Sequence, residues 1–221
     1  MPRFADRADA AERLIAMLPA EIGPDWLVLG LARGGVPIAA ALARHIGAEL
    51  GVIIVCKVGA PGSQELAIAA ITGPEETQWA TNEPLVHRLG LSHAEMRKRA
   101  APAIAEVARR RAAWTGAGTV PSPTGRDVLV VDDGIATGTT AAAAIKTLRQ
   151  QGAARIVLAV PVALGSALDQ FREQDIEILC PYPDTPLSAV GAAYARFDQV
   201  ADQVVQDLLA ENAKERVRHN S

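Results

Sequence analysis

The sequence predicts a doubly wound α/β fold, in which helices flank a mostly parallel five-stranded sheet. Two observations support this prediction. The first is a series of continuous apolar runs of strand length, which are typical of strands buried on both faces of a sheet. The second is that helical stretches of about ten or more residues separate the later runs. Strands that alternate with helices pair in parallel through right-handed crossovers, so one open sheet is expected.

The elements follow one another regularly along most of the chain. An amphipathic helix over residues 6–18 begins behind Asp6, a residue type that caps helix N-termini. The first apolar run leads through an Arg-Gly-Gly turn into an alanine-rich helix that ends near His45. Later helices are expected over residues 138–151 and 164–173, and from residue 198 onward. The five strands are expected at residues 26–31, 50–55, 127–131, 156–160 and 176–179.

Residues 57–126 interrupt this alternation. The segment opens with a Gly-Ala-Pro-Gly loop, and it continues through a weaker strand candidate at 65–71 and a charged helix at about 92–113. A Gly/Pro/Thr linker over residues 115–125 closes it. We interpret the segment as an insertion over one edge of the sheet, because a long irregular stretch within a compact domain usually has a function.

Two basic runs in that charged helix, residues 97–99 and 109–111, raise the question of nucleic acid binding. Glu95 and Glu106 are interspersed with them, and no aromatic residues are interleaved. A solvated helix face therefore explains the runs better than a nucleic-acid surface does.

The composition predicts a single domain over residues 1–221, with 49% hydrophobic residues and a formal net charge of -3. Cys56 and Cys180 show no metal-binding spacing, as expected in a reducing compartment. Residues 1–20 carry charges and lack the apolar stretch of a signal peptide, so a cytoplasmic protein is expected. The mild acidity disfavours nucleic acid as a partner, no membrane partner is expected, and a homo-oligomer remains open.

The most informative segment is Val-Leu-Val-Val-Asp-Asp-Gly-Ile-Ala-Thr-Gly-Thr-Thr-Ala, residues 128–141. It places Asp132 and Asp133 at the carboxyl end of a buried strand, the edge at which open α/β sheets bind ligands. A Gly/Thr loop follows and leads into a helix, so backbone N–H groups and the helix N-terminus can hold a phosphate. The two acids suit vicinal hydroxyls or a divalent cation beside that phosphate. A phosphorylated ribose ligand combines these features.

Other known site motifs fit this segment less well. The loop lacks the lysine of a Walker P-loop, and the chain has neither G-x-G-x-x-G at Gly30 or Gly134 nor a G-x-S-x-G nucleophile elbow. Metal-dependent phosphotransfer sites also carry acids at strand ends, but the further acid and lysine they need are not evident. A Gly/Thr turn that merely caps a helix is the remaining structural alternative.

The run Val-Val-Asp-Asp-Gly-Ile-Ala-Thr-Gly-Thr-Thr, residues 130–140, resembles the phosphoribosyl pyrophosphate (PRPP) signature of the type I phosphoribosyltransferases. Leu-Ala-Arg-Gly-Gly-Val-Pro, residues 31–37, resembles the pyrophosphate loop of that family. Residues 56–71 and 189–200 resemble segments of an uncharacterised bacterial subgroup. The resemblance spans most of the chain, and residues 72–125 match least. It implies a transfer of 5-phosphoribosyl from PRPP to a nitrogenous base with release of pyrophosphate, and therefore a pentosyltransferase that uses Mg²⁺.

The same resemblance implies roles for single residues. Asp132 and Asp133 would hold the ribose hydroxyls, directly or through water on magnesium. The loop residues Gly134, Ile135, Ala136, Thr137, Gly138, Thr139 and Thr140 would bind PRPP, with residues 136–140 around the 5-phosphate. Arg33 with Gly34 and Gly35 would bind the departing pyrophosphate, because a guanidinium can hold two oxygens at once. Lys57 would meet pyrophosphate or magnesium, although a solvated lysine at a strand end explains it equally well.

The acceptor pocket is expected under a hood at about residues 180–197. Tyr182, Tyr194 and Phe197 are base-stacking candidates, with core packing as the alternative for each. Ala136 stands where the 6-oxopurine members carry an acid, so hypoxanthine and guanine are expected to be poor acceptors. A non-catalytic protein that senses PRPP or a nucleotide remains the alternative function.

Overall fold

The computed structural model describes residues 2–115 and 121–219. Its main sheet has five parallel strands in the order β2-β1-β6-β7-β9. This arrangement confirms the predicted α/β class and all five predicted strands, whose ends differ from the predicted ones by at most two residues. The strands are β1 (Leu27–Leu31), β2 (Glu49–Ile53), β6 (Asp127–Val131), β7 (Arg155–Ala159) and β9 (Glu177–Leu179).

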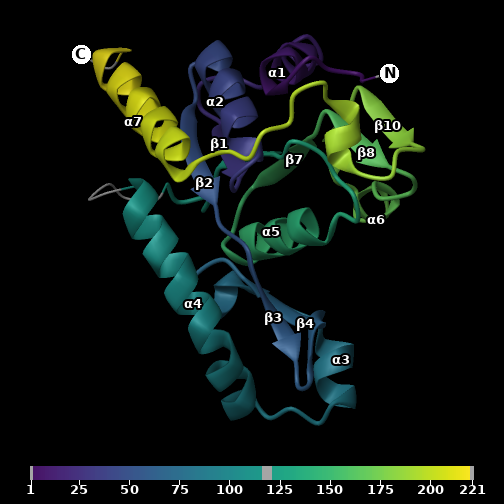
Figure 1. Cartoon of the computed structure of the whole chain (residues 1–221). Helices are drawn as coiled ribbons and strands as arrows, with labels where there is room; N and C mark the ends of the chain where they lie inside the picture. Colours follow the sequence, from purple (N-terminus) through teal and green to yellow (C-terminus); the bar gives the residue numbers. More distant parts are fainter. Residues whose placement is uncertain (1, 116–120, 220–221) are drawn as a thin grey trace.

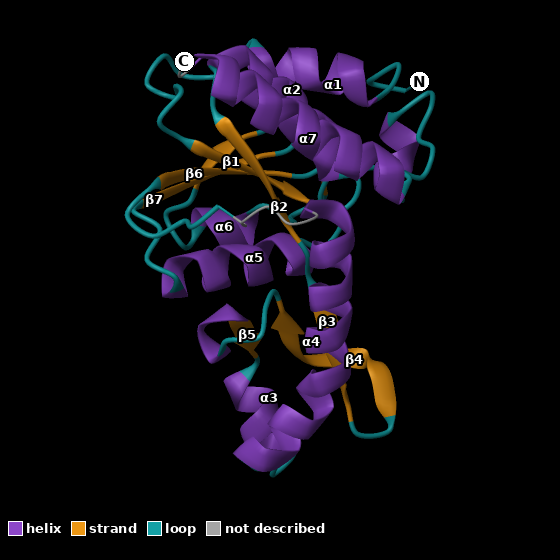
Figure 2. Ribbon diagram, turned by 90° about the vertical axis from the view of Figure 1, so that its left-hand side faces the viewer, coloured by secondary structure: helices purple, strands orange, loops and turns teal. Residues whose placement is uncertain are grey.

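Helices cover both faces of this sheet (Figure 2). One face carries α1 (Arg7–Ile15), α2 (Gly35–Ile46) and α7 (Asp202–His219), and the other carries α5 (Thr139–Gln150) and α6 (Asp169–Arg172). Successive residues of β6 point to opposite faces of the sheet. Leu129 packs in the apolar cluster that contains α1 and α2, and Val128 and Val130 pack in the cluster that contains α5. Burial on both faces explains why the strands are continuous apolar runs.

The predicted helix over residues 164–173 is shorter than expected, because only α6 forms. Residues 162–164 form strand β8 (Val162–Leu164), which pairs with β10 (Tyr182–Thr185). Gly165 follows with φ +48°, and its N–H donates to the Thr185 carbonyl at 3.0 Å. Leu164 and Gly165 therefore pair with β10 and do not join the predicted helix. Strand β10 and the 3-10 turn η2 (Val190–Ala193) lie within residues 180–197, the region predicted as the hood.

Residues 57–115 of the predicted insertion build a small second layer that continues from β2 and lies beyond α5 (Figure 1). Its antiparallel sheet has the order β3-β4-β5, where the sequence suggested one weak strand. The elements are β3 (Cys56–Ala60), β4 (Ser63–Ile71), η1 (Glu76–Gln78), β5 (Trp79–Thr81), α3 (Glu83–Arg88) and α4 (His93–Thr115). Val52 of β2 and Val205 of α7 join its apolar cluster, which attaches this layer to the β2 edge. The expected linker at 115–125 lies partly outside the described residues.

Among the described residues, no helix combines the length and the apolar character needed to span a membrane.

Candidate functional site

The two adjacent acids lie at the carboxyl edge of the parallel sheet, directly after β6. The Asp133 N–H donates to Oδ1 of Asp132 at 2.9 Å, and both side chains are half-buried. Burial raises the pKa of Asp132, and the neighbouring charge of Asp133 raises it further. Burial also raises the pKa of Asp133, and a hydrogen-bonded arginine partly offsets this rise. Two acids in this setting need a cation or hydroxyl donors beside them.

That arginine is Arg7, at the start of α1. Its Nη2 and Nε donate to Oδ2 of Asp133 at 2.7 and 3.0 Å. Its Nη1 donates to the Asp198 carbonyl at 2.8 Å, and its guanidinium lies 4.1 Å from the centre of the Phe197 ring. Sequence analysis missed Arg7, because the ion pair joins residues 126 positions apart and no motif marks the arginine.

The Gly/Thr loop forms the entrance to α5, as the motif predicts. Gly138 takes φ +76° immediately before Thr139, the first residue of the helix. The loop is supported from α6, where Gln170 Nε2 donates to the Thr137 carbonyl at 2.8 Å. A Cβ on Gly138 would lie 2.3 Å from that same nitrogen, so any other residue here would displace the Gln170 side chain and also strain the backbone at positive φ. The hydroxyls of Thr137 and Thr139 lie 3.1 Å apart on the exposed side.

Two of the predicted PRPP-binding residues act as supports in this loop. Ile135 is 2% exposed, and its N–H and carbonyl pair with Val162 and Leu164. Gly134 packs so closely that a Cβ there would lie 2.5 Å from Val190. Ala136, Thr137 and Thr139 are the exposed residues of the loop.

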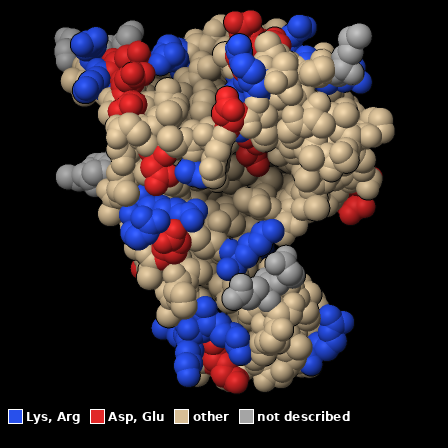
Figure 3. Space-filling view, viewed as in Figure 1, with Lys and Arg blue, Asp and Glu red and all other residues tan. Residues whose placement is uncertain are grey.

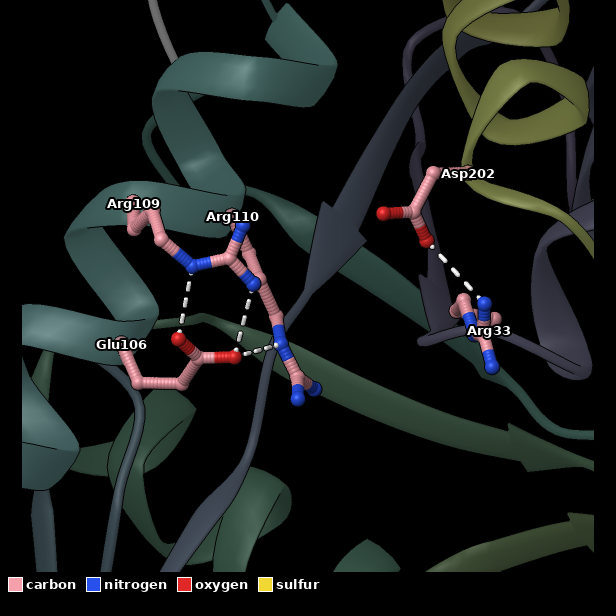
Figure 4. Close-up of polar contacts among 5 residues, drawn as sticks. All are labelled: Arg33, Glu106, Arg109, Arg110 and Asp202. Atoms are coloured by element: carbon pink, nitrogen blue, oxygen red, sulfur yellow. Dashed lines mark hydrogen bonds and ion pairs between the residues drawn. The ribbon is translucent and has the colours of Figure 1, made fainter.

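The Arg-Gly-Gly turn packs directly against the acids, although about one hundred residues separate them. A Cβ on Gly34 would lie 1.9 Å from Asp133 Oδ2, and one on Gly35 would lie 2.4 Å from the Val131 carbonyl oxygen. The Ala32–Arg33 peptide bond is cis. Arg33 Nη1 donates to Asp202 Oδ1 at 3.1 Å (Figure 4). The structure thus brings Arg33, Gly34, Gly35 and the acid pair to one edge of the sheet. Figure 3 shows a hollow in one face of the molecule.

Lys57 lies in β3 of the small antiparallel sheet and not on the edge of the main sheet. It lines a cavity of about 430 Å³ between α5 and the small sheet, together with Thr139 and Lys146, and Arg33 is not part of that lining. The structure therefore places Lys57 beside the first turn of α5. Its assignment to pyrophosphate or magnesium remains a prediction.

The three aromatic candidates all make packing contacts. The Tyr194 hydroxyl donates to the Asp133 carbonyl at 2.6 Å, and its ring stacks on Phe197 with the centroids 4.8 Å apart. Tyr182 packs edge-on against Phe4, and Arg3 lies over its ring. Tyr194 and Phe197 thus support Asp133 and Arg7 in this arrangement, and base stacking remains untested for all three.

The donor set fits magnesium only together with a ligand. The described residues contain no cluster of three or more His, Cys, Asp or Glu side chains able to hold a metal. Magnesium is usually held by one or two carboxylates plus substrate phosphates and water. Asp132 and Asp133 match such a site when the substrate supplies further oxygens. Oδ2 of Asp133 already accepts a hydrogen bond from Arg7.

Comparisons with known proteins identify relatives of this chain. The phosphoribosyl transferase domain model matches residues 3–196. A Mycobacterium tuberculosis H37Rv protein, named provisionally as a phosphoribosyl transferase, is 37% identical over 93% of this chain. The chain spans only 46% of that protein, about half the length of the curated relatives it matches.

Solved structures share the fold. The protein TT1426 from Thermus thermophilus superposes with a TM-score of 0.83 at 34% identity, over 95% of this chain and 98% of its own. A hypothetical protein from Neisseria gonorrhoeae, solved with bound ppGpp, has a TM-score of 0.51 at 12% identity, over 96% of this chain and 98% of its own. The second likeness concerns the fold alone.

Proposed function

The chain belongs to the phosphoribosyl transferase domain family, and on that premise we propose that it transfers 5-phosphoribosyl from PRPP to a nitrogenous base and releases pyrophosphate. The observation that carries the proposal is the convergence of three segments at one sheet edge. These are the acid pair after β6, the Gly/Thr loop that opens α5 and the Arg33 turn, which touches Asp133 through Gly34.

Each segment has a distinct task in the proposed reaction. The loop at residues 136–140 binds the 5-phosphate through backbone N–H groups and threonine hydroxyls. Asp132 and Asp133 accept hydrogen bonds from the ribose hydroxyls. Arg33 neutralises the charge that grows on the pyrophosphate as its bond to C1 of the ribose breaks. Magnesium, held by the acid pair and the substrate oxygens, would supply further positive charge for the leaving group.

Positioning dominates this chemistry. The bond to the leaving group lengthens while the base nitrogen approaches the opposite face of C1, so no enzyme nucleophile is needed. Holding the ribose by its phosphate and hydroxyls fixes C1 relative to both groups, and such alignment is a large part of enzymatic rate enhancement. The two cysteines fit this account, because burial raises the pKa of Cys180 to about 11 and also raises the pKa of Cys56.

The experiment is a panel of nitrogenous bases incubated with PRPP and magnesium, with pyrophosphate release as the readout. Base-dependent release by the parent protein, lost in Asp133→Asn, supports the transferase. PRPP binding without release for any base would contradict the transferase and favour the sensing alternative. The absence of PRPP binding would overturn both.

A further inference from the structure

Figure 4 shows a pair of arginines from the insertion in the same view as Arg33 and Asp202. Arg109 and Arg110 lie in the C-terminal half of α4, and both are held by Glu106. Glu106 Oε2 and Oε1 accept from Arg109 Nε and Nη2 at 2.8 and 2.9 Å, and Oε1 also accepts from Arg110 Nε at 2.5 Å. These two ion pairs lower the pKa of Glu106 to about 2. One carboxylate therefore holds two guanidinium groups side by side.

The C-terminal half of α4 is fixed against α7, the helix whose first residue pairs with Arg33. Val107 and Trp114 of α4 share an apolar cluster with Val205 of α7. Gln206 Nε2 donates to the Ala113 carbonyl at 2.8 Å, which ties the two helices by a hydrogen bond as well. The arginine pair is thus held in a defined position relative to Asp202 at the start of α7.

Two electrostatic relationships connect this pair to the core. Glu106 raises the pKa of Arg109, and the Asp202 carboxylate adds to this, so Asp202 acts on Arg109 as well as on Arg33. Burial raises the pKa of Cys56, and the Arg110 charge opposes it. Cys56 follows closely after Ile53, whose carbonyl accepts the Ala32 N–H of the Arg33 turn at 3.0 Å. Arg109 therefore lies within electrostatic reach of Asp202, the partner of Arg33, and Arg110 lies within reach of Cys56.

Ion pairs hold all three of these arginines. Asp202 pairs with Arg33, and Glu106 pairs with both Arg109 and Arg110. Both members of the Arg33–Asp202 pair are substantially exposed, at 31% and 49%, so the bond between them is open to exchange with solvent and ligands. A guanidinium binds carboxylate and phosphate oxygens through the same N–H groups, so a phosphate can replace a carboxylate on an arginine.

We propose that Arg109 and Arg110 complete, together with Arg33, a two-sided binding site for the pyrophosphate group, in which Asp202 is a resident counter-ion that pyrophosphate displaces. The inference rests on the proposed function and extends it, because it assigns part of the leaving-group site to the insertion. It also gives the basic run at 109–111 a role other than that of a solvated helix face.

The test is calorimetric titration with two probes, inorganic pyrophosphate and ribose 5-phosphate. Arg109→Gln and Arg110→Gln should each weaken pyrophosphate binding by about threefold to tenfold and leave ribose 5-phosphate unchanged. Arg99→Gln is the matched control, since it removes an exposed arginine earlier on the same helix. Arg109→Lys should retain part of the affinity. Asp202→Asn should tighten pyrophosphate binding, because it removes the competing charge.

Pyrophosphate binding equal to the parent's in both glutamine variants would overturn the inference. So would unchanged or weaker pyrophosphate binding in Asp202→Asn. In either case PRPP binding by the parent protein would leave the proposed function standing. A parent protein that binds neither pyrophosphate nor PRPP would refute both together.

Discussion

Arg7 holds Asp133 by two hydrogen bonds to a single oxygen, at 2.7 Å from Nη2 and 3.0 Å from Nε. Only Oδ2 is used, so Oδ1 remains unbonded to Arg7. Both side chains are 14% exposed, and Phe197 covers the guanidinium. The second acid of the signature is therefore oriented and charge-balanced before any ligand arrives, an arrangement that lowers the cost of binding.

Replacing Arg7 should damage both stability and ligand binding. Arg7→Met leaves a largely buried carboxylate without its cation, which costs about 1–3 kcal/mol of folding stability. We expect a lower Tm and PRPP binding weakened by about tenfold or more. Arg7→Lys keeps the charge but not the paired geometry, so its losses should be smaller. Thermal unfolding and calorimetry would measure both effects, and unchanged PRPP affinity in Arg7→Met would contradict the role given to this residue.

Adding one methyl group at Gly34 should disrupt the site while sparing the fold. The new Cβ would lie 1.9 Å from Asp133 Oδ2, so the turn or the carboxylate must move. We expect Gly34→Ala to lose most PRPP affinity. Gly23→Ala is the matched control, because no atom lies within 4 Å of its added Cβ. Equal PRPP affinities in the two variants would show that the contact between the turn and Asp133 does not matter.

Gly138 and Gly152 allow the effect of space to be separated from that of backbone strain. Both have positive φ, at +76° and +81°, so alanine costs about 1 kcal/mol of stability at either position. Only at Gly138 does the Cβ collide, 2.3 Å from Gln170 Nε2 in the phosphate loop. Titration with ribose 5-phosphate should therefore show weaker binding in Gly138→Ala alone. Similar losses in both variants would point to general destabilisation instead.

The thiols should be slow to react at neutral pH. Burial raises the pKa of Cys180 to about 11, so at pH 8 only about one molecule in a thousand carries this thiolate. Alkylation of Cys180 by iodoacetamide should be slow at pH 8 and accelerate toward pH 11. A Cys56→Ala/Cys180→Ala double variant should keep pyrophosphate release, because the proposed reaction uses no thiolate. Rapid labelling of Cys180 at pH 7 would refute the pKa shift.

We expect Ala136 to limit which bases serve as acceptors. Its methyl side chain is exposed in the phosphate loop and can neither donate nor accept a proton. The 6-oxopurine members of the family carry an acid at this position, and the polar atom that its absence leaves unpaired costs about 1–3 kcal/mol, so hypoxanthine and guanine should be poor acceptors. Steady-state rates with hypoxanthine, guanine, adenine, uracil and orotate would decide this. Efficient turnover of hypoxanthine or guanine would contradict it while leaving the PRPP site intact.

Local patterns account for what could be predicted from the sequence. Leu27–Leu31 and Asp127–Val131 are buried strands with continuous apolar runs, and the Gly/Thr run after the acids has the composition of an anion-binding helix entrance. The strand β8 escaped prediction because its pairing partner β10 lies well beyond it in the chain. Arg7 and Asp202 escaped for the same reason, since their partners are 126 and 169 residues away. Distant contacts leave no periodic signal in the sequence.

The central claim is that the acid pair and the loop after it bind PRPP, and calorimetric titration of PRPP with magnesium tests it most directly. We predict saturable binding by the parent protein. In Asp133→Asn, the loss of charge-assisted hydrogen bonds worth about 1.5–3 kcal/mol should weaken that binding by roughly tenfold to a hundredfold. PRPP affinity in Asp133→Asn equal to that of the parent, or no binding by the parent at all, would contradict the claim.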